Sequence, residues 1–161
     1  MELNLVYLLL GSNIGDRFAH MQNGIRKIDA QAGMIQKQSS FYETEPWGVI
    51  NQANYLNAAV LIKTPYTPAE LFHRLKSIEA DEGRTDQTKY ASRTLDIDIL
   101  FYNNLILRTP QLKIPHPKLS SRRFVLEPLS EIAPAFMHPE FNKTISQLLM
   151  ECTDDKKVNL L

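Results

Sequence analysis

Residues 93–100 are Arg93-Thr94-Leu95-Asp96-Ile97-Asp98-Ile99-Leu100, an alternation of apolar and polar side chains that is typical of a β-strand. Asp is depleted in strands, yet this strand contains two. Because alternate residues of a strand point to the same face, Asp96 and Asp98 are predicted to stand side by side, with Cα atoms about 6.5 Å apart. The stretch therefore predicts a sheet with an apolar layer on one face and a partner for two like charges on the other.

The elements around this strand follow from the spacing of apolar residues. Thr67-Pro68-Ala69-Glu70 is a capping box that predicts the start of a helix, and Gly33 is a typical helix end. The predicted elements are, in chain order, a strand over residues 3–10, a helix that includes Ile14 to Ile28, strands over residues 35–43 and 54–63, a helix from Thr67 to about Gly83, and the strand over residues 93–101.

The order strand, helix, strand, strand, helix, strand is the split βαβ pattern of a ferredoxin-like fold. We therefore expect an α+β protein with a βαββαβ core, in which both helices lie on one face of an antiparallel sheet. The helix-covered face is predicted to contain Leu56, Ala58, Val60, Ile62, Leu95, Ile97, Ile99 and Phe101. The opposite, uncovered face is predicted to contain Tyr55, Asn57, Asp96 and Asp98. From Asn103 onward the chain is predicted to form a Pro-rich C-terminal extension with a short helix near residues 144–151.

Length and composition narrow the class of protein. A chain of 161 residues with 43% apolar and 22% charged residues predicts one folded domain over residues 1–161. Lys plus Arg equals Asp plus Glu at 18 each, so no net charge attracts nucleic acid or a membrane surface. The single cysteine, Cys152, excludes an internal disulfide and a cysteine-based metal cage. No apolar run approaches the ~20 residues of a membrane span, and the apolar start lacks a basic region, so we expect a cytoplasmic protein. Nothing in the sequence points strongly to an oligomer, so we expect a monomer.

The paired carboxylates favour a metal site. Two like charges on neighbouring positions repel each other unless a cation lies between them, although a solvent-facing strand could also tolerate two acids. Mg²⁺ binds one or two carboxylates together with water and substrate phosphates, and two such ions can hold a phosphoryl group between them. Arg84 and Arg93 stand at the two ends of the preceding polar loop, and Arg122 lies downstream. Guanidinium groups bind phosphate oxygens bidentately, so these residues favour a phosphate ligand.

The common nucleotide-binding motifs are absent. No glycine-rich turn is followed by Gly-Lys-Ser or Gly-Lys-Thr, and the turn Gly11-Ser12-Asn13-Ile14-Gly15-Asp16 does not match the dinucleotide fingerprint. Metals and arginines would therefore have to hold the phosphates of a nucleotide. His116 lies between Pro115 and Pro117, which restrict its backbone and suit a phosphate or base contact. An isolated histidine is also commonly structural or solvated.

Aromatic residues offer a place for a flat heterocycle. Trp47, Tyr55 and Phe124 could stack on its faces, and the amide of Asn57 could donate to and accept from its edge. Each aromatic residue alone is equally compatible with core packing. Asn57 is more informative, because an amide in a central strand needs partners.

The combined pattern resembles the 6-hydroxymethyl-7,8-dihydropterin pyrophosphokinase family. Residues 89–100, Lys89-Tyr90-Ala91-Ser92-Arg93-Thr94-Leu95-Asp96-Ile97-Asp98-Ile99-Leu100, are similar to the signature of that family. The further matches come in the order of the family over most of residues 5–135, and are residues 11–16, Phe41-Tyr42-Glu43-Thr44, Tyr55-Leu56-Asn57-Ala58, Ile78-Glu79, Gly83-Arg84, Ile114-Pro115-His116-Pro117, Arg122 and Phe124.

The resemblance implies that a pyrophosphoryl group passes from the co-substrate ATP to the hydroxymethyl oxygen of the reduced pterin, with release of AMP, in folate biosynthesis. It implies Asp96 and Asp98 as ligands of two Mg²⁺ ions, and these two residues with Arg84 and Arg93 as the catalytic group. The residues implied to bind ATP are Lys76, Glu79, Arg84, Arg93, Ile99, His116 and Arg122. The residues implied to bind the pterin are Thr44, Trp47, Tyr55, Asn57 and Phe124.

The chain departs from the family in the loop before the signature arginine. Tyr90-Ala91-Ser92 stands where members often have Trp-Gly-Pro, and Asp86 stands where many have a basic residue. Both departures are expected to change the contacts of this loop and the rate of turnover, but not the type of reaction. Trp47 replaces a residue that is often smaller and apolar, so the pterin pocket is expected to have a different shape.

Two other function classes use a similar fold. Palm-type polymerases and nucleotidyl cyclases also place metal-binding aspartates on a ferredoxin-like sheet, but from different strands, and polymerases need a basic track for nucleic acid. A non-catalytic module for a small molecule predicts no metal dependence. The products formed from ATP distinguish the pyrophosphokinase, the palm-type enzyme and the binding module, because only the pyrophosphokinase releases AMP in response to the pterin.

Overall fold

The computed structural model describes residues 2–45, 54–83 and 94–161. Its elements are β1 (Asn4–Ser12), α1 (Arg17–Gln31), β2 (Met34–Gln38), β3 (Tyr42–Thr44), β4 (Tyr55–Thr64), α2 (Pro68–Asp81), β5 (Asp96–Tyr102), β6 (Leu107–Arg108), β7 (Lys113–Ile114), the 3₁₀-helix η1 (Leu119–Ser121), α3 (Arg123–Ile132), α4 (Ile145–Glu151) and β8 (Val158–Leu160). None of the helices in the described ranges is both long enough and apolar enough to cross a membrane.

The main sheet is antiparallel and has the strand order β5-β1-β4-β3-β8, with β2 also paired to β4. The long strands β1 and β4 form its centre. At one end of the sheet a row of directly paired residues crosses four strands: Tyr42 pairs with Asn57, Asn57 with Gly11, and Gly11 with Asp96. Directly opposed residues share a face of the sheet, so this row brings residues that are far apart in the sequence to one place.

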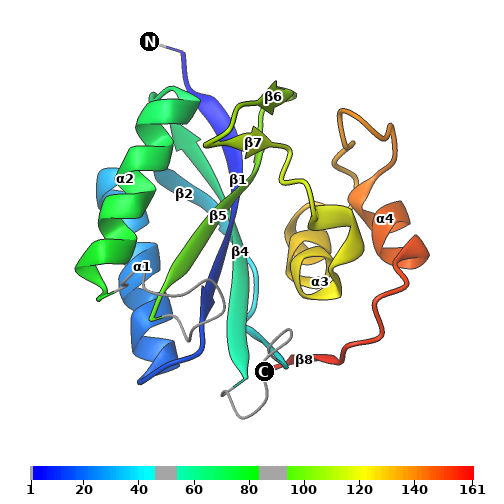
Figure 1. Ribbon diagram of the computed structural model, residues 1–161, viewed down its shortest axis with the longest axis horizontal. Helices are drawn as coiled ribbons and strands as arrows, with labels where there is room; N and C mark the ends of the chain where they lie inside the picture. The colour runs from blue at the N-terminus through cyan, green and yellow to red at the C-terminus, as the bar shows by residue number, and fades with distance from the viewer. Residues whose placement is uncertain (1, 46–53, 84–93) are drawn as a thin grey trace.

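Helices α1 and α2 cover one face of the sheet, as the sequence predicts (Figure 1). The predicted capping box is confirmed at the start of α2, where Thr67 Oγ1 accepts from the N–H of Glu70 and Glu70 Oε1 accepts from the N–H of Thr67. The core under these helices is built from the apolar residues Val6, Leu8, Leu10, Met21, Ile28, Leu56, Ala58, Val60, Ile62, Leu71, Leu75, Ile78, Leu95, Ile97 and Ile99. This core fixes α2 against the strand that carries the two aspartates.

Helices α3 and α4 lie over the opposite face, so the prediction that helices cover only one face is wrong for the whole molecule (Figure 1). They enclose a second core, which contains Leu9, Leu100, Phe101, Leu119, Val125, Leu126, Leu129, Ile145 and Leu148. Pro128 lies inside α3, at a place where proline normally interrupts a helix. The proline-rich composition therefore conceals an apolar helix, and the C-terminal extension forms a packed layer.

Phe101 belongs to the second core, contrary to the prediction that it faces α1 and α2. The cause is a change of register between β1 and β5, where Leu8 pairs with Ile99 but Tyr7 pairs with Phe101. The additional residue, Leu100, reverses the alternation of side chains beyond it. A second difference concerns the strand predicted over residues 35–43, which consists of two separate strands, β2 and β3.

Candidate functional site

Two buried polar groups mark the end of the sheet next to β3. Thr44 and Asn57 are only 2% and 3% exposed. Thr44 Oγ1 and Asn57 Nδ2 have no hydrogen-bond partner among the described residues. A buried polar group without a partner costs about 1–3 kcal/mol, which makes such atoms good indicators of a ligand. Both lie on the face that α3 covers, because Ala59, two residues after Asn57, packs against Ile132 of that helix.

Gly11 leaves the space that the Asn57 side chain occupies. A Cβ atom at Gly11 would lie 2.9 Å from Asn57 Oδ1 and 3.6 Å from Cδ1 of Tyr55. The amide and the aromatic ring therefore both lie against the bare backbone of β1. This arrangement holds a hydrogen-bonding group and an aromatic ring side by side at the end of the sheet.

The carboxylates of Asp96 and Asp98 stand on β5, the strand next to β1. Glu79 of α2, which is 1% exposed, holds this strand in place. Its Oε2 accepts from the N–H of Ile97 at 2.7 Å, and its Oε1 lies 3.2 Å from Nζ of Lys76. Glu79 thus fixes the residue between the two aspartates.

Burial and neighbouring negative charge dominate the electrostatics around Asp98. Burial, followed by the negative charges of Asp96 and Glu79, raises the pKa of Asp98 to about 7, although Lys76 and Arg122 act in the opposite direction. No group of three or more metal-binding side chains occurs within the described ranges. Two carboxylates nevertheless match the number of protein ligands with which Mg²⁺ is commonly held, the rest being water and phosphate. The residues present therefore fit that ion.

A pocket of about 220 Å³ opens beside β5. Its walls come from α2, from β5 and from the segment that includes β7. The lining residues are Phe72, Leu75, Lys76, Ile97, Asp98, Ile99, Pro110, Gln111, Leu112, Lys113, His116 and Pro117. Apolar side chains line part of the pocket, together with a carboxylate, two lysines and an imidazole, so it suits a flat base that continues into a charged group.

His116 is held as a neutral imidazole. Burial, followed by the positive charges of Arg122 and Lys118, lowers its pKa to about 4, against a smaller opposite effect of Asp96. Its Nδ1 accepts from the N–H of Lys118 at 3.2 Å, so in the neutral ring the proton resides on Nε2. Its backbone N–H donates to the carbonyl of Leu100 at 3.1 Å, which anchors it to β5. His116 therefore presents one N–H donor.

Arg122 and Phe124 flank the start of α3. The guanidinium carbon of Arg122 lies 5.7 Å from the centre of the Phe124 ring. The positive charge of Arg122 acts to lower the pKa of both Asp98 and His116. The start of α3 thus carries a cation next to an aromatic ring.

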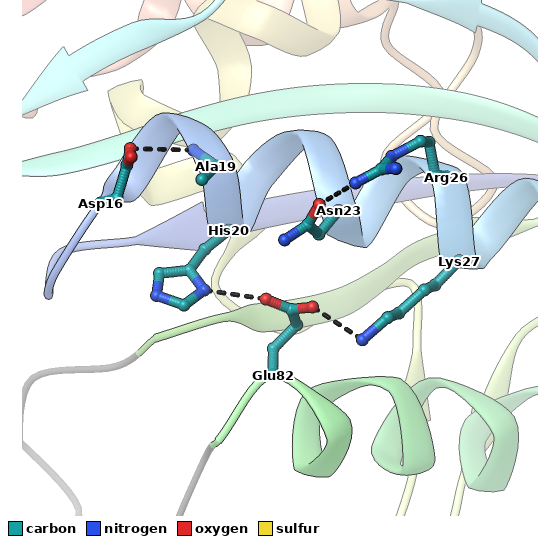
Figure 2. A network of polar contacts seen from close by, with 7 residues as sticks. All are labelled: Asp16, Ala19, His20, Asn23, Arg26, Lys27 and Glu82. Carbon is teal, nitrogen blue, oxygen red and sulfur yellow. Dashed lines mark hydrogen bonds and ion pairs between the residues drawn. The ribbon is translucent and has the colours of Figure 1, made fainter.

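The end of α2 is tied to α1 by a polar network (Figure 2). Glu82 Oε2 lies 2.8 Å from Nδ1 of His20, and Glu82 Oε1 lies 2.7 Å from Nζ of Lys27. Burial alone would raise the pKa of Glu82, but the hydrogen bonds and charges of His20 and Lys27 lower it overall. Gly83 follows with φ of +90°, a conformation that favours glycine. The network fixes the point where the chain leaves α2 toward Arg84.

The described site residues lie in two adjoining groups. Thr44, Tyr55 and Asn57 line the β3–β4 end of the sheet, and Phe124 stands at the start of α3. Lys76, Ile99, Asp98 and His116 line the pocket, with Asp96, Glu79 and Arg122 beside it. Trp47, Arg84 and Arg93 lie outside the described residues, as do Asp86 and Tyr90 to Ser92. Sequence reasoning missed the pocket residues Phe72 and Leu112, which carry no signal beyond their apolar character.

The comparison with protein families shows the family of the chain. The family model for 7,8-dihydro-6-hydroxymethylpterin-pyrophosphokinase (HPPK) matches residues 7–134. The chain belongs to this family. A 2-amino-4-hydroxy-6-hydroxymethyldihydropteridine pyrophosphokinase from Aquifex aeolicus is 41% identical over 148 residues, which cover 92% of each chain. The enzyme of that name from Bacillus subtilis is 44% identical over 130 residues, which cover 80% of this chain and 78% of the relative.

Solved structures give the same fold for this HPPK family member. A triple mutant of Plasmodium falciparum HPPK-DHPS superposes with a TM-score of 0.79 over 93% of this chain, at 17% sequence identity. The match covers 43% of the longer Plasmodium chain. At this identity the likeness concerns the fold alone.

Proposed function

We propose that this HPPK family member transfers the pyrophosphoryl group of ATP to 6-hydroxymethyl-7,8-dihydropterin and releases AMP, as a step of folate biosynthesis. The observation that carries the proposal is the row across β3, β4, β1 and β5, which joins Asn57, whose buried Nδ2 has no partner among the described residues, to Asp96 through Gly11. One end of this row offers hydrogen bonds to a heterocycle, and the other end offers carboxylates for a metal–phosphate group. The reaction requires both ligands next to each other.

The pterin is proposed to bind against β3 and β4. A reduced pterin is flat and has alternating donors and acceptors along its edge, which Asn57 and Thr44 would satisfy. Tyr55 lies beside Asn57 against Gly11, and Phe124 is in the first turn of α3; their rings would flank the heterocycle. Trp47, outside the described residues, would complete the pocket.

ATP is proposed to occupy the pocket beside β5, with its base against the wall that includes Ile99 and its phosphates toward Asp98. Lys76, Arg84, Arg93 and Arg122 would contact phosphate oxygens, and His116 would donate from Nε2. Glu79 would support ATP binding indirectly, because it holds β5 in place. Asp96 and Asp98 would hold two Mg²⁺ ions, which when bound neutralise negative charge on the triphosphate.

In the proposed reaction the hydroxymethyl oxygen attacks the β-phosphorus of ATP, and the bond between that phosphorus and the oxygen that bridges to the α-phosphate breaks. AMP leaves with that oxygen, and the hydroxyl proton is released. The contribution of the chain is to hold the two substrates in line and to exclude water. Asn57 and Thr44 would set the position of the nucleophile, and the arginines and His116 that of the triphosphate.

For the fold and assembly, we propose a ferredoxin-like core and a monomer. The order β5-β1-β4 followed by β2 and β3, with α1 and α2 on one face, supports the ferredoxin-like description. Within this scheme α3, α4 and β8 are additions to that core.

Product analysis tests the proposed function. The purified protein is incubated with ATP and Mg²⁺, with and without 6-hydroxymethyl-7,8-dihydropterin, and the nucleotides and pterins are separated by chromatography. We expect one AMP for each pterin diphosphate and no AMP without the pterin. Formation of pyrophosphate or a cyclic nucleotide would favour a palm-type enzyme, and binding of ATP without turnover would favour a binding module.

A further inference from the structure

The C-terminal residues 152–161 return from α4 to the main sheet (Figure 1). There β8 pairs with β3, with Val158 opposite Thr44 and Leu160 opposite Tyr42. The N–H of Leu161 also donates to the carbonyl of Phe41 at 3.0 Å. β3 has only three residues, and β8 lies on the side of it that β4 does not occupy. The position of Thr44 therefore depends on a strand from the far end of the chain.

The other end of this segment is bound to α3. The backbone N–H of Arg123 donates to the carboxylate of Asp154 at 3.0 Å, and its Nε donates to the carbonyl of Asp154 at 2.9 Å. Nη2 of Arg123 donates to the carbonyl of Cys152 at 3.0 Å. Arg123 stands between Arg122 and Phe124, so these bonds fix the first turn of the helix that presents both residues.

β8 contributes little to the core. Leu160 is 62% exposed and Leu161 is 56% exposed, and Asn159 is also exposed. A strand that buries so little apolar surface gains little hydrophobic stabilisation. Its main contribution is a set of backbone hydrogen bonds to β3. Residues 135–161 also lie beyond the part of the chain that the family model matches.

We propose that residues 152–161 form a strap that positions the two sides of the pterin site, with Arg123 and Asp154 as positioning residues. On one side the strap holds β3 and hence Thr44. On the other side it holds the first turn of α3 and hence Phe124. This inference rests on the proposed function, because it assigns the strap to the pterin rather than to ATP, whose pocket lies beside β5 at the opposite edge of the sheet.

Steady-state kinetics with both substrates test the strap. Deletion of residues 157–161 removes β8 but keeps Asp154, and Arg123→Gln removes the side-chain bonds to the other end while β8 remains. We expect either change to raise the KM for the pterin about tenfold, which corresponds to about 1.4 kcal/mol. The deletion should leave the KM for ATP within about twofold, whereas Arg123→Gln should also raise the KM for ATP, because the same helix start presents Arg122. Lys143→Gln is the matched control, because it breaks an exposed ion pair with Glu151 in the same region, and it should change neither KM.

The outcomes separate the strap from the proposed function and from a general structural role. Without pterin-dependent AMP from the wild type, the proposed function fails and the strap fails with it. With an active wild type, an unchanged pterin KM in both variants overturns the strap alone. A parallel rise of both KM values in the deletion variant, together with a lower melting temperature, also overturns it, because that pattern indicates general loss of structure. If the deletion variant does not fold, the KM of Arg123→Gln for the pterin decides whether the proposed strap stands.

Discussion

Gly11 and Asn57 are direct partners across β1 and β4, and a Cβ atom at Gly11 would lie 2.9 Å from Oδ1 of Asn57. The Gly11→Ala substitution should therefore displace the amide of Asn57, which can rotate away at little cost to the fold. If Asn57 binds the pterin, we expect the KM for the pterin to rise about tenfold, the value of one or two lost hydrogen bonds. Steady-state kinetics at saturating ATP measure this effect.

A double-mutant cycle isolates the cause of that effect. Asn57→Ala removes the amide, so adding Gly11→Ala to it should produce little further loss. Additive losses in the double variant would show that Gly11 acts independently of Asn57. The account would also be contradicted if Gly11→Ala lost more free energy of unfolding than the free energy that corresponds to its rise in KM.

Glu79 should influence the titration of Asp98 from a neighbouring helix. Its negative charge is one of the causes that raise the pKa of Asp98 to about 7, after burial and Asp96. Glu79→Gln removes the charge and keeps an oxygen to accept from the N–H of Ile97. The pKa of Asp98 in the ligand-free protein should fall, as measured by NMR of the Asp98 side-chain carboxyl carbon. Glu82→Gln, at the C-cap of the same helix, is the control and should leave the pKa of Asp98 unchanged.

Glu82 should make the free energy of unfolding depend on pH in the acidic range. Because the pKa of Glu82 is lowered from its ordinary 4.5 in the folded chain, the unfolded chain binds its proton at higher pH. The contribution of Glu82 to the free energy of unfolding is therefore complete above pH 4.5. It is lost as the pH falls through the pKa that Glu82 has in the folded chain. Glu82→Gln should lower the free energy of unfolding at pH 7 by about 1–3 kcal/mol.

Urea unfolding at pH 7 and below pH 4.5 measures this contribution. The difference between the wild type and Glu82→Gln should shrink at the lower pH. Glu151→Gln, in an exposed pair with Lys143, is the control and should change stability little at either pH. A difference for Glu82→Gln that stays constant with pH would contradict the assigned ion pairs.

Two substitutions of His116 distinguish its ring nitrogens. Gln carries an amide near the position of Nε2, whereas Asn carries one near Nδ1. If Nε2–H donates to ATP, His116→Asn should raise the KM for ATP about tenfold, and His116→Gln should retain part of the affinity. Equal loss in both variants would show that the ring acts by packing instead.

The sequence predicts the first core well, because that core depends on local periodicity. The alternation of buried and less buried residues from Leu95 to Ile99 and the capping box at Thr67 are both confirmed, although β5 begins only at Asp96. The change of face at Phe101 could not be predicted, since it depends on the pairing of Leu8 with Ile99 across two strands. The layer formed by α3 was missed because Pro128 conceals its apolar spacing.

The candidate site could be predicted in part for similar reasons. Asp96 and Asp98 share a face by strand geometry alone, and Asn57 is conspicuous in an apolar strand. The contribution of β8 has no local signal, because three residues near the end of the chain are too few to predict a strand. Its pairing with β3 is visible only once the fold places Val158 next to Thr44.

The central claim is that Asp96 and Asp98 serve pyrophosphoryl transfer, and it is tested by the rate of pterin-dependent AMP formation in Asp96→Asn and Asp98→Asn. Both substitutions keep the shape of the side chain and remove the charge that would hold a metal. Asp81→Asn, at an exposed position on α2, is the control. The account predicts a fall in kcat of about 100-fold or more in both variants and none in the control. Full activity in either variant, with a normal melting temperature, would contradict it.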